Sequence, residues 1–140
     1  AQGDSLEQLY PELRNAWFGS LKGLHVDSWL EVHGIDNYRV EFSQAAPQPG
    51  ALRLFFLNLG GYERQVFGEA HRYLLVAARD KAEAKQLGKQ RMAAGWLKPH
   101  TDAILDVDDC LPIDLLAGRY VHLVEGEHQG IRQRSDYILI

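Results

Sequence analysis

Two short motifs in this sequence each place an imidazole beside a carboxylate. His25 is followed by Asp27, and His100 is followed by Asp102, so the pattern His-x-Asp occurs twice. On a strand, residues two apart point to the same side, so each motif would present both groups together. Four such groups, if they converge, suit zinc, iron or manganese. The competing interpretation is structural: each pair begins a strand, with the aspartate in the turn and the histidine half-buried.

A second pair of groups on one side of a predicted strand is Glu69 and His71. A histidine that is oriented by a carboxylate can act as a general base when both lie in a pocket. These two residues are therefore the candidate catalytic residues. The alternative is an exposed hydrogen bond at the beginning of a strand, which needs no pocket.

A third candidate is an anion or nucleotide site formed by glycines and lysines. Gly60 and Gly61 are adjacent, and a row of basic residues follows at four-residue spacing, made of Lys81, Lys85 and Lys89. Glycine loops cradle phosphate best where a helix begins directly after them, and no helix is predicted there. The simpler prediction is that the two glycines break the strand that precedes them.

The His-x-Asp motifs lie in two segments of the chain whose sequences resemble each other. The segment 4–32 aligns with the segment 80–107 when Leu24 is left unpaired, and the matches keep one order. They include Gly19 with Gly95, Leu21 with Leu97, Lys22 with Lys98, His25 with His100, Asp27 with Asp102, and Val32 with Val107. Repeated matches in one order indicate a duplicated structural unit.

Local patterns predict the helices and strands of both copies. Each helix begins at an aspartate with a glutamate three residues later, Asp4 with Glu7 and Asp80 with Glu83, and the first is expected to end at Gly19. Alternating or apolar segments predict strands. The expected elements are helices at 4–19 and 81–94, and strands at 24–32, 37–42, 51–59, 70–78, 104–107, 119–124 and 137–140.

These elements predict an α+β fold of internally duplicated β-β-α-β-β units, with antiparallel sheets and helices packed on one face. The chain of 140 residues forms a single domain, 1–140. Residues 1–42 make a partial copy that lacks its two leading strands, 51–124 make a full copy, and 43–50 connect them. Unless another segment fills the missing places, one sheet edge stays open and favours pairing with a second chain. We therefore expect a homo-oligomer, with Trp29 as a possible interface residue.

Composition limits the partners and the compartment. The net charge is −4, whereas nucleic acids and anionic membranes attract basic surfaces. We expect no nucleic-acid partner and no membrane span. One cysteine, Cys110, excludes an internal disulfide and fits a reducing cytoplasm. The three aspartates around it, Asp106, Asp108 and Asp109, disfavour a reactive thiolate.

Several segments resemble an uncharacterised bacterial family, domain of unknown function 1543. They are GLHVDSWLEV, FFLNLGGY and FGEAHRYLLVAARDKAEAK, and the resemblance extends from Asp4 to about Val124. The resemblance implies one or two copies of the domain per protein, and it implies no activity or cofactor. The favoured function is a non-catalytic interaction or scaffold domain. The alternatives are a metal-dependent, hydrolase-like enzyme that uses the His-x-Asp pairs, and an anion- or nucleotide-binding module.

Overall fold

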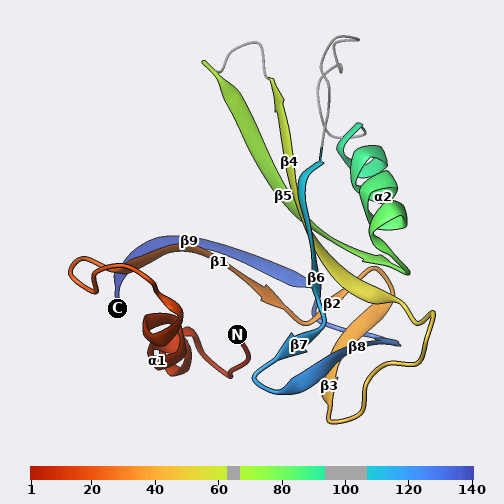
Figure 1. Cartoon of the computed structure of the whole chain (residues 1–140), viewed down its shortest axis with the longest axis horizontal. Helices are drawn as coiled ribbons and strands as arrows, with labels where there is room; N and C mark the ends of the chain where they lie inside the picture. The colour runs from red at the N-terminus through yellow and green to blue at the C-terminus, as the bar shows by residue number, and fades with distance from the viewer. Residues whose placement is uncertain (63–66, 94–106) are drawn as a thin grey trace.

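The computed structural model of this chain describes residues 1–62, 67–93 and 107–140. In chain order its elements are α1 (Leu6–Ala16), β1 (His25–Val32), β2 (Gly34–Ile35), β3 (Tyr38–Ser43), β4 (Arg53–Tyr62), β5 (Glu69–Ala78), α2 (Lys81–Ala93), β6 (Val107–Ile113), β7 (Leu115–Leu116), β8 (Arg119–Glu125) and β9 (Ile131–Leu139). The strands form three sheets, with the orders β5-β4-β6, β2-β3-β8-β7 and β1-β9 (Figure 1). Every strand pair in the described residues is antiparallel, so the predicted α+β class is confirmed.

The best-buried part of the molecule is the sheet β5-β4-β6. Its central strand β4 contains the continuous apolar run from Leu54 to Leu57, and successive residues of a strand point to opposite faces. Phe55 and Leu57 are 0% exposed and pack with Val76 in one core. Leu54 packs with Leu75 in a second core that also contains residues of β2 and β8. Because β4 is covered on both faces, it requires an uninterrupted apolar sequence.

The glycine pair does not interrupt β4. Gly60 and Gly61 are buried inside this strand and pair with His71 and Ala70 of β5. The predicted break is therefore wrong. Glycine weakens a strand because it has no side chain to pack, but the long ladder with β5 holds the backbone extended at both residues.

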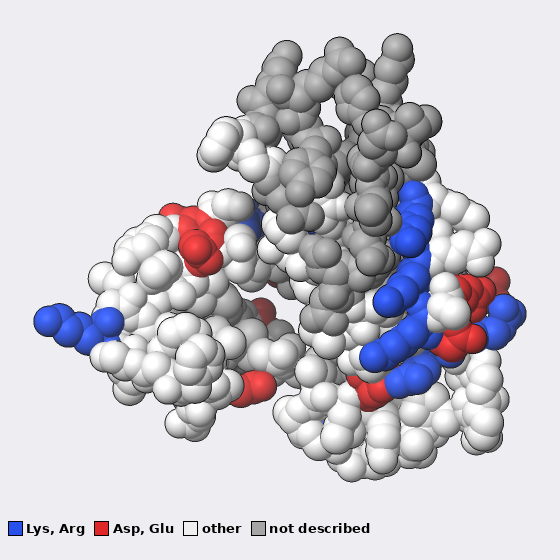
Figure 2. All heavy atoms as spheres, turned by 45° about the horizontal axis from the view of Figure 1, so that its top comes forward, with Lys and Arg blue, Asp and Glu red and all other residues white. Residues whose placement is uncertain are grey.

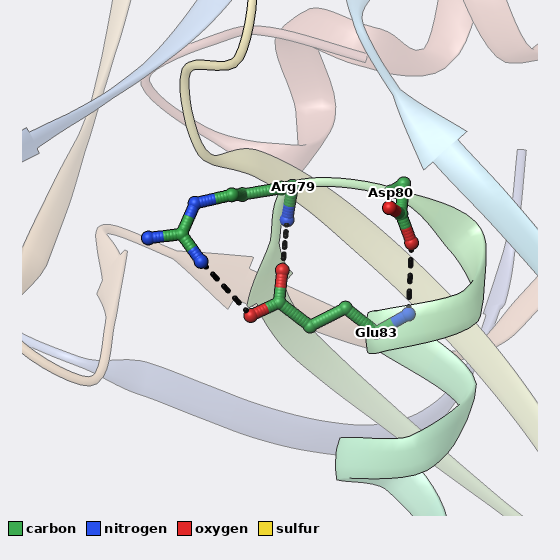
Figure 3. A network of polar contacts seen from close by, with 3 residues as sticks. All are labelled: Arg79, Asp80 and Glu83. Carbon is green, nitrogen blue, oxygen red and sulfur yellow. Dashed lines mark hydrogen bonds and ion pairs between the residues drawn. The ribbon is translucent and has the colours of Figure 1, made fainter.

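Helix α2 lies over one face of this sheet, where it contacts all three strands (Figure 1). At its beginning, Asp80 Oδ1 accepts a hydrogen bond of 2.9 Å from the backbone N–H of Glu83. Glu83 Oε2 in turn accepts one of 2.7 Å from the backbone N–H of Arg79 (Figure 3). The first bond satisfies an N–H group that a helix start leaves without a partner, and the second ties the residue before the cap to the first turn. The predicted cap at Asp80 is confirmed.

Small residues bring α2 close to the sheet. Ala84 is fully buried in the core that contains Leu57. A Cβ atom added to Gly88 would lie 2.5 Å from Cδ1 of Leu57, which is closer than real Cβ atoms approach. The helix is therefore seated through Ala84 and Gly88 rather than through a stripe of large apolar residues.

Two hairpins in the sheet β2-β3-β8-β7 have the same geometry. Asp36, between β2 and β3, has φ of 55°, and Ala117, between β7 and β8, has φ of 49°. Non-glycine residues rarely adopt this left-handed conformation, and aspartate tolerates it better than alanine. Corresponding backbone bonds of 2.9 Å close the hairpins, from N–H of Val40 to O of His33 and from N–H of Val121 to O of Asp114.

The third sheet is a two-stranded ribbon of β1 and β9, which lie far apart in the sequence. β9 begins at Ile131, whereas the sequence predicts a final strand only from Tyr137. Between these positions its sequence is mostly polar, and nearly every residue of β9 is exposed. Apolar periodicity could therefore not reveal the first part of this strand.

Helix α1 lies on the side of the molecule that carries this ribbon and buries none of its residues (Figure 1). Its N-cap is Ser5, whose side chain accepts a bond of 3.4 Å from N–H of Gln8, so the predicted cap at Asp4 is wrong by one residue. The helix ends at Ala16 with Trp17 as the C-cap, earlier than the predicted end at Gly19. Of the two described helices, α2 is the one that packs on a sheet face, as predicted, and it contacts three strands there.

The ribbon and the sheet β5-β4-β6 have matching registers. Val32 pairs with Ile131, as Ile113 pairs with Leu54. From these positions the pairing of β1 with β9 is regular as far as an irregularity next to Asp27, and the pairing of β6 with β4 is regular as far as one next to Asp108. Topology therefore sets β1 level with β6, and β9 level with β4. In this register Val32 corresponds to Ile113. The sequence alignment instead matches Val32 with Val107, which is six residues earlier.

Candidate interaction site

The first predicted metal pair lies at the start of β1. His25 Nε2 and Asp27 Oδ2 are 4.0 Å apart, and their side chains are 37% and 78% exposed. His25 Nδ1 lies 2.9 Å from O of Gly23, and since a carbonyl only accepts, Nδ1 carries the proton. The His25 ring also lies against Tyr137 of β9, with 4.3 Å between ring centroids. The imidazole is thus held by the ribbon, with Asp27 near its second nitrogen.

The second predicted metal pair, His100 and Asp102, lies outside the described residues. Within the ranges that the structure describes, no group of three or more histidine, cysteine, aspartate or glutamate side chains is placed to hold a metal ion. Two exposed ligands alone do not form the three- or four-ligand site that zinc uses in proteins.

The candidate catalytic pair lies along β5. Glu69 is the first residue of this strand, and His71 is exposed two residues later. His71 Nδ1 lies 3.1 Å from Oδ1 of Asn58 on the neighbouring strand β4. A cavity of about 310 Å³ lies away from His71, and it is lined by residues 45–48, 51–52, His122 and Leu123. His71 does not line this cavity.

The predicted anion-binding residues do not converge on a loop. Gly60 and Gly61 are buried in the β4 ladder, so they do not form a phosphate-cradling turn. Lys81, Lys85 and Lys89 are exposed on α2, while Ala84 and Gly88 are buried against the sheet. Figure 2 shows basic side chains gathered along the side of the molecule where α2 lies. The lysine row is a solvated helix face.

Large apolar side chains are exposed around the ribbon. They come from the segment after α1 and from both strands: Trp17 is 44% exposed, Phe18 93%, Leu21 56%, Leu30 37%, Ile131 39%, Tyr137 62% and Leu139 64%. Trp29, predicted as a possible interface residue, is half-buried on β1. Aromatic and large aliphatic groups of this kind contribute most of the energy of protein interfaces.

Among the described residues, each strand of the ribbon has one unpaired side, but only β9 corresponds to a strand that is paired on both sides in the sheet β5-β4-β6. In the described part of the chain β9 pairs with β1 alone, whereas its counterpart β4 pairs with both β5 and β6. Strand edges present free N–H and C=O groups that can pair with another chain. The outer edge of β9 and the exposed apolar groups beside it form the candidate interaction site.

A histidine that the sequence patterns did not single out fixes the start of β9. His128 Nε2 lies 2.9 Å from O of Asp36, and His128 Nδ1 accepts 2.9 Å from N–H of Gly130. Gly34 leaves room for this ring, since a Cβ there would lie 2.3 Å from Cγ of His128. The Asp36 carboxylate also binds Arg91 of α2 at 2.7 Å. The turn at Asp36 therefore connects α2, the hairpin of β2 and β3, and the segment before β9. The sequence gave no signal for this role of His128, because a single histidine between two strands matches no motif.

Comparison with known proteins places these observations in a family. The fold is an α+β domain. Residues 1–42 match the profile of the family described as Domain of Unknown Function (DUF1543). The crystal structure of a protein Il1583 from Idiomarina loihiensis is similar over 99% of this chain and 81% of that chain, with 32% identity and a TM-score of 0.69. The chain belongs to the DUF1543 family.

The comparison with curated proteins finds no match. In the described residues, no helix combines the length and apolar character needed to cross a membrane.

Proposed function

We propose that this chain is a non-catalytic interaction domain that associates with a second copy of itself through the open edge of β9. The observation that carries the proposal is that β9, among the described residues, is paired on one side only. Its counterpart β4 has a neighbour on both sides. Exposed Tyr137 and Leu139 on the same strand would gain burial in a pair.

We also infer an internal duplication, which supports this proposal. The order helix, long strand, short strand and hairpin strand occurs twice, as α1-β1-β2-β3 and as α2-β6-β7-β8. The two hairpins share their turn geometry, and the segments HVDSWLEV and DVDDCLPI align in the register set by topology. In this scheme 51–124 is a full copy and 1–42 a partial one. β9 supplies the first leading strand of the partial copy, and the place equivalent to β5 is left for a partner.

The metal-dependent enzyme remains a separate hypothesis with its own test. His25 and Asp27 are close enough to act together, but the hypothesis needs further ligands, and it assigns that role to His100 and Asp102. Elemental analysis of the purified protein decides between the hypotheses. Stoichiometric zinc, iron or manganese that is lost in a His25→Ala, His100→Ala variant would favour the enzyme.

We place the proposed homo-oligomer in the bacterial cytoplasm. A reducing compartment suits the single thiol of Cys110, which is buried at 4% exposure in the core beneath α2. The acidic net charge gives no electrostatic attraction to nucleic acid.

Sedimentation velocity over a hundredfold concentration range tests the proposal. We expect a monomer–dimer equilibrium that shifts with concentration and persists without metal. A Ser135→Pro variant, which removes one backbone donor from β9, should weaken association. A monomer at all concentrations would contradict the proposed function.

A further inference from the structure

The ladder with β1 determines which backbone groups of β9 face outward. N–H of His33 donates to O of Gly130, and N–H of Ile140 donates to O of Leu24, each at the end of the ribbon. In an antiparallel ladder, residues that bond to the partner strand alternate with residues whose N–H and C=O face away. Counting inward from each end gives Ile131, Gln133 and Ser135 before the irregularity and Leu139 after it. Tyr137 lies within the irregularity, where its N–H donates to Oδ1 of Asp136 and not to β1, so we add Tyr137 to this outward set.

This outward set is symmetric about Ser135. When a second β9 is laid antiparallel with Ser135 opposite Ser135, every outward residue meets an outward residue of the other copy. Gln133 then lies opposite Tyr137, and Ile131 lies opposite Leu139. Two copies related by a two-fold axis make the same contacts in both directions, as an isologous dimer interface requires.

The charges of β9 fit the same register. Arg134 lies opposite Asp136 of the second copy, and the two-fold axis creates this contact twice. Opposite residues on paired antiparallel strands share a face, so each contact joins unlike charges.

The ribbon also leaves positive charge to be neutralised on this strand. Within the chain, Arg132 and Arg134 both lie near one carboxylate, that of Glu31, at 3.8 and 3.9 Å. Two guanidinium groups share this single carboxylate. A second acidic group therefore complements this part of the ribbon, and Asp136 of another copy supplies it.

From this symmetry and charge pattern, we infer that two copies pair β9 to β9 antiparallel, with Ser135 on the two-fold axis and Arg134 facing Asp136 of the other copy. The two ribbons then form one four-stranded sheet, with the order β1-β9-β9-β1. The inference rests on the proposed self-association and adds its register.

Disulfide trapping tests the register directly. In bonded antiparallel pairs, opposed Cα atoms lie about 5.5 Å apart, which suits a disulfide. Ser135→Cys should therefore give a covalent dimer under mild oxidation. Gln133→Cys is the matched control: its two copies would lie about 13 Å apart, too far to link. The buried native Cys110 does not compete.

Charge reversal provides the second arm of the same experiment. Asp136→Arg or Arg134→Asp alone places like charges opposite each other twice, and each should weaken dimerisation roughly tenfold or more. An equal mixture of the two variants restores both unlike contacts in a heterodimer and should recover association. Asp136→Asn keeps an acceptor for the N–H of Tyr137, which Asp136 now binds at 2.8 Å, so it controls for local structure.

The outcomes separate the register from the proposed function. Covalent dimers of Ser135→Cys but not of Gln133→Cys, together with rescue by mixing, support the inference. If dimers form in solution but the two cysteine variants cross-link equally and the charge reversals have no effect, the register is overturned while self-association stands. A wild-type chain that stays monomeric overturns both.

Discussion

At matching positions of two sheets, β4 carries Phe55 and Leu57, whereas β9 carries Arg132 and Arg134. The apolar pair is 0% exposed beneath α2, and the arginines lie beside Glu31 with more than half of each side chain exposed. Helix α1 has a clear apolar stripe, Leu6, Leu9, Tyr10 and Leu13, but buries none of its residues. The difference shows that an apolar stripe does not by itself bury a helix: α2 is seated on an apolar sheet, whereas the equivalent positions of the ribbon carry arginines.

The largest contrast should come from truncating one leucine in each region. Leu57→Ala removes a fully buried side chain and should lower the free energy of unfolding by about 3–5 kcal/mol. Leu139→Ala, at 64% exposure, should change it by less than about 0.5 kcal/mol at concentrations where the chain is monomeric. Urea denaturation measures both, and equal losses would refute the contrast between the two regions.

The helix caps should give a smaller contrast of the same kind. Asp80→Ala leaves the N–H of Glu83 without its acceptor and should cost about 1 kcal/mol, because α2 is part of the main core. Ser5→Ala removes the cap of α1, which buries no residues and can fray without global unfolding. Its effect on the same urea transition should stay below about 0.5 kcal/mol. A Ser5 variant as costly as the Asp80 variant would show that α1 is packed after all.

The two left-handed turns sharpen the comparison further. Ala117→Gly relieves an L-residue at φ of 49° and should stabilise the fold by about 0.5–1 kcal/mol. Asp36→Gly relieves less strain, because aspartate tolerates this conformation better than alanine, and it also removes the ion pair with Arg91, so the net change should stay within about 0.5 kcal/mol. Thermal unfolding of both variants measures the difference. A larger gain at Asp36 would mean that the Arg91 contact contributes nothing.

The smallest effect is a local titration in α1. The backbone N–H of Glu7, and then the Ser5 side chain, hold the pKa of the Glu7 carboxyl below its ordinary value of 4.5. A lowered folded pKa stabilises the helix above pH 4.5, and this contribution is lost as the pH falls below 4.5 through the folded value. NMR titration of Glu7 should show the lowered pKa, and Ser5→Ala should move it back toward 4.5. An unchanged titration curve in that variant would remove Ser5 as a cause.

Sequence patterns predicted α1, β1, β3, β5, α2 and most of β4, but missed nearly all of β6, which was expected at 104–107, and most of β9. The run from Leu54 to Leu57 and the cap at Asp80 report burial and hydrogen bonding that are local to each segment. Most of β9 carries polar residues, because it is an exposed strand that β1 holds from a distance in sequence. No local pattern can report such a pairing.

The candidate site was predictable only in outline. An open edge follows from counting strands in the two copies, but the strand that forms it does not. Matching His25 with His100 by residue type favoured a metal site. The strand register instead sets Val26 and Asp27 level with Val107 and Asp108. The role of His128 depends on the room that Gly34 leaves, which only coordinates reveal.

The pairing of β1 with β9 also sets an order of events during folding. β4, β5, α2 and β6 are close in sequence, so they can associate after closing short loops, whereas His25 must find Leu139 across most of the chain. Closing a long loop costs more entropy, and contacts of this kind form late. The ribbon is therefore expected to form last and to open first, with the fastest amide exchange among the sheets. The strand proposed to meet a partner would be the one that the chain releases most readily.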